Sequence, residues 1–335
     1  MALVLFYFLH TFMRKRQEVS PSCKNSLRNN SGLRDHQNGR RFMRMRVLVT
    51  GVTGQLGHDC VVELKDRGME VRGVSSKDFP LTDAKAMRRV MAAYKPNCVI
   101  HCAAYTAVDR AEDDEAACMA VNAEGTANLA KLCREFHAKM VYISTDYVFP
   151  GDGDAPYETD APKGPQNVYG KSKLMGEEAI QSILKRYFIV RISWVFGING
   201  KNFIRTMLRL GESHAKLTVV DDQVGSPTYT RDLSVLLADM IQTERYGVYH
   251  ATNEGFCSWA ELAAEVFRQA GMPVEVTPVP SSAYPTRAVR PKNSRMSKNS
   301  LTEAGFALLP RWQDAVGRYL IELESMKEQR EALAE

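Results

Sequence analysis

The chain has 335 residues, of which 44% are hydrophobic and 25% are charged, a balance that excludes a fibrous or wholly disordered protein. The net charge of +5 is unevenly placed, because residues 1–45 carry nine Lys/Arg and two Asp/Glu, and the rest of the chain is slightly acidic. The folded part is therefore not a basic nucleic-acid-binding surface. The chain has seven cysteines, and no two of them form the CxxC pair that is typical of zinc sites and of redox-active disulfides. We therefore expect no metal.

Residues 1–45 are predicted to be a disordered, basic extension. The apolar run Ala2–Met13 is too short to span a bilayer, and its basic cluster follows the run, whereas a signal peptide has it in front. Met43 and Met45 stand directly before the first predicted strand, so residues 1–42 are interpreted as an appendage or a misassigned upstream start. We expect a cytoplasmic protein without stable membrane insertion, and a peripheral anchor is the alternative.

From Arg46 onward, short apolar runs alternate with stretches of helical periodicity, as in βαβ units. Strands are predicted at Arg46–Thr50, Glu70–Val74, Cys98–His101, Met140–Ser144 and Phe188–Ile192. Helices are predicted at Gln55–Arg67, Ala84–Tyr94, Ala116–Phe136, Lys171–Leu184, Phe203–Leu210, Ser234–Thr243 and Ser258–Ala270. The pattern predicts an α/β fold with a Rossmann-type, doubly wound parallel sheet whose strands are buried on both faces. We expect residues 46–193 to form mainly a dinucleotide-binding domain of this type, and residues 194–335 to form mainly a smaller substrate-binding lobe with segments that return to that domain.

A glycine-rich turn follows the first strand. Gly51, Gly54 and Gly57 have GxxGxxG spacing, and glycines there let the backbone approach a pyrophosphate at the start of a helix. This spacing is typical of the short-chain dehydrogenase/reductase superfamily, which the region resembles, and an ordinary tight turn is the alternative. The other residues predicted to contact the dinucleotide are Gln55, Leu56, Asp83, Ala103, Ala104, Tyr105, Thr106, Tyr169 and Lys173.

The end of the second strand bears on the choice of cofactor. An acidic residue there would hold a ribose 2′-hydroxyl and disfavour a 2′-phosphate. Val74 is followed by Ser75, Ser76 and Lys77, and an acid comes only at Asp78. This pattern is equivocal, and we expect NADPH as the cofactor, with NADH tolerated.

Tyr169 and Lys173 lie one helical turn apart at the start of a predicted helix. This spacing lets an ammonium lie beneath the phenol, lower its pKa toward working pH and make it a general acid. The third catalytic group is predicted to be a hydroxyl at the end of the fourth strand. Ser144 and Thr145 point oppositely in an extended strand, so only one of them faces the substrate. The spacing in related sequences favours Thr145, which would stabilise charge on a carbonyl oxygen.

Together these motifs resemble the dTDP-4-dehydrorhamnose reductases, a family of extended short-chain dehydrogenases. The resemblance covers nearly everything from Met45 onward, through HCAAYTAVDRAE, VNAEGTANL, STDYVF, YGKSKLMGE, RISWVFG, DQVGSPT and RPKNSRMSKNSL. It implies reduction of the C4 ketone of a dTDP-sugar, with Thr145, Tyr169 and Lys173 catalytic. It also implies substrate contacts by Thr145, Asp146, Trp194, Arg290 and Asn293, although a core tryptophan and an exposed salt bridge are the alternatives for Trp194 and Arg290.

Two other functions stay open from the sequence alone. A non-catalytic, NADP-binding regulatory subunit similar to the methionine adenosyltransferase beta subunit is one, and Trp194 with the RPKNS stretch favours the enzyme over it. A nucleotide-sugar epimerase or dehydratase is the other. A dehydratase would want a second carboxylate after Asp146, where this chain has Tyr147. The sequence leaves the oligomeric state open, and a homodimer is one expectation.

Overall fold

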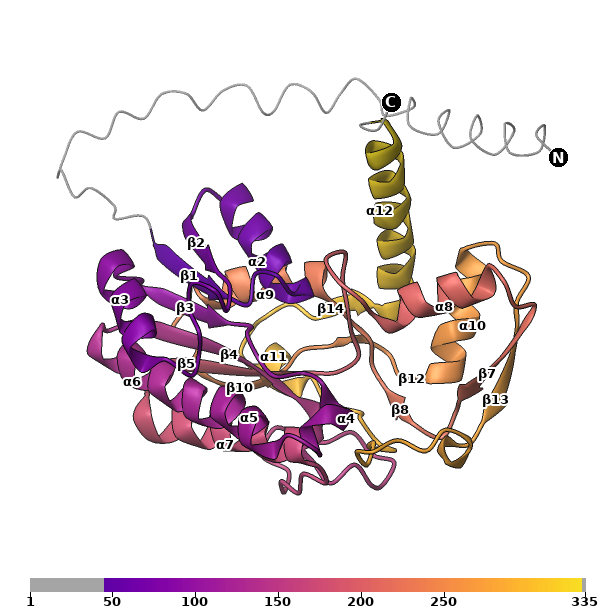
Figure 1. Ribbon diagram of the computed structural model, residues 1–335, viewed down its shortest axis with the longest axis horizontal. Coiled ribbons are helices and arrows are strands. Elements are labelled where there is room, and N and C mark those ends of the chain that lie inside the picture. The colour runs from indigo at the N-terminus through magenta and orange to yellow at the C-terminus, as the bar shows by residue number, and fades with distance from the viewer. Residues whose placement is uncertain (1–44, 333–335) are drawn as a thin grey trace. The chain divides into compact units, whose positions relative to one another are not determined.

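The computed structural model describes residues 45–332, and Figure 1 shows a parallel sheet covered by helices. The sheet has six strands in the order β10-β5-β4-β3-β1-β2, and every neighbouring pair is parallel. The strands are β1 (Arg46–Thr50), β2 (Glu70–Val74), β3 (Cys98–His101), β4 (Lys139–Thr145), β5 (Tyr187–Ile192) and β10 (Gly247–His250). This arrangement confirms the predicted α/β fold with a doubly wound sheet.

Successive residues of the inner strands enter two separate cores. In β1, Val47 and Val49 pack on one face of the sheet, and Leu48 packs on the other. The first core is completed by α2 (Gln55–Asp66), α9 (Thr230–Met240) and α11 (Asn299–Glu303). The second is completed by α3 (Ala84–Tyr94), α6 (Thr126–Glu135) and α7 (Val168–Ile183). Burial on both faces explains why the inner strands read as continuous apolar runs.

Two sequence predictions need correction here. Only Val74 of β2 is buried, because this strand forms the edge of the sheet and was wrongly expected to be covered on both faces. The single helix predicted over Ala116–Phe136 is interrupted, since α5 (Glu115–Met119) passes into a π-helical segment, η2 (Ala120–Gly125), before α6. Such π-helical segments frequently occur at functional sites.

A third core lies in the C-terminal part of the chain. It includes residues of α8 (Phe203–Gly211), α10 (Trp259–Gln269) and α12 (Trp312–Ala332), next to the parallel pair β7 (Lys216–Val220) and β13 (Glu275–Val279). Figure 1 shows α8, α10, β7 and β13 together at one end of the described part of the chain. In contrast, β10 and α9 return to the main sheet, so the segments after Trp194 serve both regions. The domain boundary at residue 194 stays a prediction.

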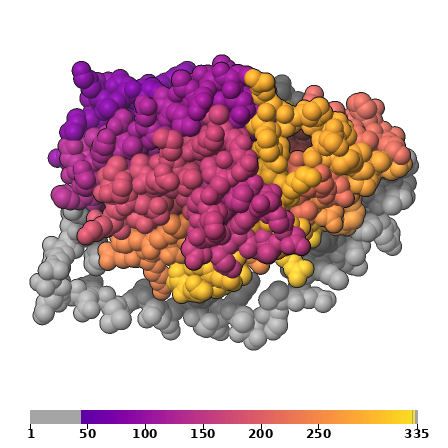
Figure 2. Space-filling view, turned by 90° about the horizontal axis from the view of Figure 1, so that it is seen from below, coloured from indigo at the N-terminus to yellow at the C-terminus, as the bar shows by residue number. Residues whose placement is uncertain are grey.

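Two C-terminal segments approach the carboxyl end of β4. Residues 224–229 contain β8 (Val224–Gly225) and β9 (Thr228–Tyr229), and β9 pairs with β6 (Val195–Phe196) directly after Trp194. Residues 291–296 begin inside the RPKNS motif (Arg290–Ser294), and Met296 forms a bridge to Tyr157. In Figure 2, orange and yellow C-terminal segments border the magenta surface. The two segments bring late parts of the sequence to the predicted catalytic strand.

Candidate active site

The glycine turn is built so that no side chain intrudes on it. Gly51 has a φ of +72°, and a Cβ there would lie 2.7 Å from the backbone nitrogen of Ala103. A Cβ on Gly57 would lie 2.4 Å from the carbonyl oxygen of Gly51, so this glycine allows α2 to start close to the turn. The free N–H groups at the start of α2 therefore stay accessible to an anion.

A cavity of about 290 Å³ lies beside this turn. Its lining contains Gly51, Ala103, Ala104 and Tyr105, all predicted cofactor contacts. The Tyr105 hydroxyl is buried and finds no hydrogen-bond partner among the described residues, so it offers a polar contact to a ligand. Ser75, Ser76, Phe79, Pro80, Leu81, Thr82 and Val121 complete the wall with Thr50. The glycine cradle and the orphaned hydroxyl fit a dinucleotide.

Four other predicted cofactor residues have different surroundings. The Asp83 carboxylate caps α3 by accepting from the backbone N–H groups of residues 85 and 86. Leu56 is buried in the first core, and Thr106 is exposed outside the cavity lining. The side-chain carbonyl of Gln55 accepts hydrogen bonds from the Gly197 backbone N–H at 2.8 Å and from the side-chain amide of Asn202 at 2.9 Å. Gln55 thereby connects the glycine turn to the C-terminal part of the chain. Their cofactor contacts stay predictions, and Asp83 is explained by helix capping alone.

The choice between Ser144 and Thr145 follows from where each hydroxyl points. Ser144 donates to the Glu177 carboxylate at 2.5 Å. Glu177 is itself paired with Arg191 at 2.6 Å, and both side chains are only 2% exposed. Thr145 instead donates to Asp146 at 2.9 Å and accepts from the Tyr147 backbone at 3.2 Å. Ser144 is thus occupied by a buried ion pair, which supports Thr145 as the hydroxyl that faces the substrate.

Tyr169 and Lys173 lie on the first turns of α7, which Asn167 caps by accepting from the Gly170 backbone. The side chain of Lys173 is buried and donates to the Ile143 carbonyl at 2.7 Å. Its nitrogen also lies 3.9 Å from the centre of the Tyr142 ring. The ammonium is therefore held against β4, the strand that ends in Thr145.

The expected lowering of the Tyr169 pKa is wrong for this arrangement. Burial, reinforced by the Asp146 carboxylate, raises the pKa of Tyr169, and only the Thr145 hydroxyl opposes these effects among the groups beside it. Burial also lowers the pKa of Lys173 to about 7, with the Glu177 carboxylate acting in the opposite direction. The phenol consequently keeps its proton at neutral pH, as a proton donor requires.

The residues predicted to bind the substrate gather next to this trio. Asp146 is buried, accepts from Thr145 and from the Ser294 hydroxyl, and burial raises its pKa to about 6. Trp194 is partly exposed and stacks on Trp259 with ring centres 3.8 Å apart. That these residues form a polar and an aromatic side of one substrate site stays a prediction.

Arg290 and Asn293 are already engaged. The Arg290 guanidinium donates to the Asp109 carboxylate and to the Tyr147 hydroxyl. It therefore forms a salt bridge with Asp109, which was the alternative to a substrate contact. The Asn293 amide is buried and donates to two carbonyls of residues 152 and 155, which leaves it a positioning role in this loop. Direct substrate contacts by these two residues stay predictions.

Sequence reasoning missed Asn122, Glu177 and Trp259. Asn122 lies in the π-helical segment η2, where its amide donates to the Tyr105 carbonyl at 3.0 Å and to Ser172 at 2.9 Å. It thereby joins the cofactor cavity to the helix of Tyr169. Its place inside VNAEGTANL was an available signal, and Glu177 lies inside YGKSKLMGE.

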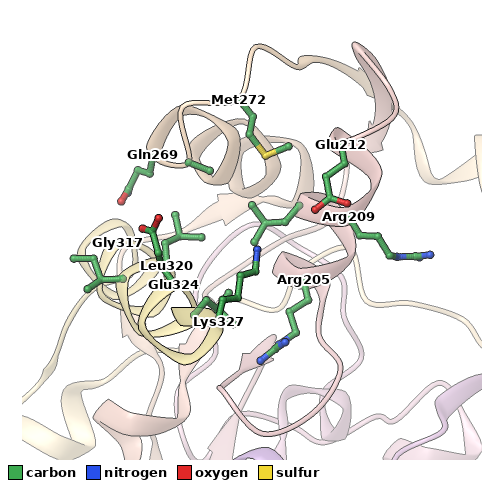
Figure 3. A pocket seen from close by; sticks show the side chains of 13 residues that line it. Arg205, Arg209, Glu212, Gln269, Met272, Gly317, Leu320, Glu324 and Lys327 are labelled. Atoms are coloured by element: carbon green, nitrogen blue, oxygen red, sulfur yellow. The ribbon is translucent and has the colours of Figure 1, made fainter. Parts of the chain in front are cut away.

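A larger cavity, of about 580 Å³, lies elsewhere. Figure 3 shows it between α8, α10 and α12, lined by apolar side chains such as Leu320 and by charged ones such as Arg205 and Glu324. It contains none of the predicted catalytic residues. Within residues 45–332, no group of three or more His, Cys, Asp or Glu side chains is placed to hold a metal ion, and no helix there is long and apolar enough to cross a membrane.

The glycine cradle, its cavity and the Thr–Tyr–Lys trio define an α/β dinucleotide-binding protein with the active-site layout of short-chain dehydrogenases. The family model described as RmlD substrate binding domain matches residues 45–325, and the chain belongs to this family. It is 42% identical over 282 residues to a dTDP-4-dehydrorhamnose reductase of Streptomyces griseus, covering 82% of this chain and 93% of the relative. It is 39% identical to the spore coat polysaccharide biosynthesis protein SpsK of Bacillus subtilis, covering 84% and 98%.

A solved structure agrees with these sequence matches. The crystal structure of a dTDP-4-dehydrorhamnose reductase from Bacillus anthracis in complex with NADP is 41% identical to this chain, with a TM-score of 0.82. The match covers 84% of this chain and 100% of the other. The comparisons favour the predicted reductase and give no support to the regulatory-subunit alternative.

Proposed function

We propose that the chain is an NADPH-dependent oxidoreductase that reduces the C4 ketone of dTDP-4-dehydrorhamnose (dTDP-4-dehydro-6-deoxy-L-mannose) to give dTDP-L-rhamnose. The observation that carries the proposal is the link that Asn122 makes between the Tyr105 carbonyl, in the wall of the cofactor cavity, and Ser172, in the helix of Tyr169 and Lys173, in a chain of this family. The cofactor, when bound, supplies the hydride. The turn at Gly51 and the wall at Tyr105 would hold it.

The chain's own residues manage the proton. Tyr169 keeps its proton because burial raises the pKa of the phenol, and it gives this proton to the ketone oxygen as C4 becomes a secondary alcohol. Thr145 turns its hydroxyl from Asp146 to the same oxygen and stabilises the charge that develops there. Lys173, fixed to the Ile143 carbonyl, supports the phenolate that remains until solvent returns the proton.

The end of β2 supports a preference for NADPH. Ser75 and Ser76 line the cofactor cavity, which has no acidic side chain in its lining. Asp78 accepts from the Ser75 hydroxyl at 2.9 Å and so is held in the turn after β2. Without a carboxylate at the ribose, a 2′-phosphate is not repelled, and NADH is tolerated because the rest of the cradle is shared.

The decisive test supplies purified protein with freshly generated dTDP-4-dehydrorhamnose and either NADPH or NADH, and follows loss of the reduced cofactor and the sugar product. We expect turnover to dTDP-L-rhamnose with the higher kcat/KM for NADPH. Cofactor binding without turnover would instead support the regulatory-subunit function. A dTDP-sugar is the partner we propose, and a cytoplasmic location and a homodimer remain proposals that this assay does not address.

A further inference from the structure

The backbone of Trp194 adopts an unusual conformation. Its φ is +50°, in the left-handed region that bulky residues rarely occupy. The DQVGSPT segment holds the backbone at this point through two hydrogen bonds. The Thr228 backbone N–H donates to the Trp194 carbonyl at 3.1 Å, and the Ser193 hydroxyl donates to the Ser226 carbonyl at 2.7 Å. Strained residues of this kind persist where the surrounding structure over-determines them, and they cluster at ligand sites.

The Trp194 ring is held from a second direction by Trp259, the first residue of α10. The two rings stack at 3.8 Å with an interplanar angle of 15°. Trp259 is itself anchored, because its indole N–H donates to the Gln223 side chain at 3.2 Å. The Phe203 ring also packs against it, with ring centres 4.7 Å apart. The α10 helix therefore supplies a fixed ring against one face of the Trp194 indole.

The edge of the Trp194 ring is enclosed by Gly225 and Ser294. A Cβ on Gly225 would lie 3.0 Å from the ring and 2.9 Å from the Ser294 Cβ. Ser294 in turn donates its hydroxyl to Asp146, next to Thr145. The aromatic wall is thereby connected to the catalytic strand through one serine.

We propose that Trp259 is a positioning residue for substrate binding, which orients Trp194 as the wall against which the sugar nucleotide packs. This inference rests on the proposed function. Trp259 acts through Trp194 and leaves the proton transfer at Tyr169 to proceed as before. Its loss therefore weakens binding of the ground state and the transition state alike, which raises KM and leaves kcat nearly unchanged.

The test compares Trp259→Ala, Trp259→Phe and Gln223→Ala with the wild type. For Trp259→Ala we expect KM for the dTDP-sugar to rise about three- to tenfold, as the loss of one aromatic pair predicts, with kcat within about twofold. Trp259→Phe should recover most of the loss because a ring remains on the stack, and Gln223→Ala should show a smaller rise. KM for NADPH should not move in any variant.

A second readout does not depend on turnover. Two indoles this close couple their electronic transitions, so the wild type should show an exciton couplet in far-ultraviolet circular dichroism, and Trp259→Ala should lose it. Trp312, the third tryptophan of the chain, is buried in the third core, and Trp312→Phe should keep the couplet. The affinity for dTDP-L-rhamnose, measured by calorimetry, should fall with the couplet.

Three outcomes would count against these ideas in different ways. Loss of the couplet with unchanged KM and unchanged affinity for dTDP-L-rhamnose would overturn the positioning role. A kcat that falls as much as KM rises would also overturn it, since Trp259 would then act on the transition state. A wild type that shows the couplet and binds dTDP-L-rhamnose without turning over the ketone would reject the proposed reaction, while the binding variants still decide the role of Trp259.

Discussion

Replacing the buried lysine of the active site should stabilise the protein while abolishing its activity. Burial lowers the pKa of Lys173 from 10.5 to about 7, so the folded state disfavours the ammonium. A pKa difference of that size lowers the free energy of unfolding of the wild type by roughly 5 kcal/mol as an upper limit. The hydrogen bond to the Ile143 carbonyl, which the substitution removes, offsets about 1 kcal/mol of this effect. Lys173→Met should therefore unfold less readily than the wild type at pH 6.

The pH dependence of this effect has a definite sign. Between about pH 7 and 10 the unfolded wild type binds a proton on Lys173 that the folded state does not, so the wild type gains stability as pH rises. The gain is about 1.4 kcal/mol per pH unit, and the advantage of Lys173→Met should shrink by about 3 kcal/mol between pH 7 and 9. Below pH 7 the advantage is constant.

Urea unfolding of the cofactor-free wild type and Lys173→Met, at several pH values, measures this difference directly. The effects of titrating groups that do not interact with Lys173 cancel between the two proteins. Lys171→Met is the matched control, because Lys171 is exposed on the same helix and its charge is solvated whether the chain is folded or not. A difference between Lys173→Met and wild type that does not change with pH would refute the reasoning.

Three further substitutions test the site. Tyr169→Phe should lower kcat by about 10²- to 10⁴-fold, since it removes the proton donor, while the Kd for NADPH from calorimetry stays within about twofold; retained kcat would remove Tyr169 from its assigned role. Gly57→Ala should weaken NADPH binding by more than about tenfold, because its Cβ would lie 2.4 Å from the Gly51 carbonyl oxygen. Gly68→Ala is the control: its φ of +71° makes the substitution strain the backbone, but its Cβ meets nothing within 4 Å, so NADPH binding should not change. Ser75→Asp should shift the ratio of kcat/KM for NADH to kcat/KM for NADPH toward NADH by about tenfold or more. An unchanged ratio would mean that the end of β2 does not contact the ribose 2′-phosphate or 2′-hydroxyl.

The inner part of the fold was predictable because its signal is local. β1 and β3 match the predicted ranges, as does α3, since each is a short apolar or amphipathic run bounded by turn residues. β10 was missed because Gly247–His250 is a short run with mixed polarity that becomes a strand only by pairing with β5. The split of the helix at η2 was also missed, since periodicity does not distinguish a π-helical segment from an α-helix.

The chemistry of the site was less predictable than its residues. The motifs named Tyr169 and Lys173, but the direction of the Tyr169 pKa shift depends on burial and on Asp146, which no spacing reveals. Likewise, the roles of Ser144 and Thr145 separate only when Glu177 is seen to occupy Ser144. Side-chain partners from distant elements decide such questions, and a single sequence does not contain them.

The proposed site has two halves that are built from different segments of the chain. The cofactor half that we propose includes the carboxyl ends of β1, β2 and β3, whereas the proposed substrate half lies around Trp194 and includes residues 223–228 and 290–294. Hydrogen bonds from Ser294 to Asp146 and from the Gly197 backbone to Gln55 are among those that join them. Substitutions in the aromatic wall can therefore alter which sugar nucleotide is bound without disturbing the cradle. Because Thr145 is the last paired residue of β4 and also bonds Asp146, we expect it to be the point at which both halves must be correctly placed for reduction to occur.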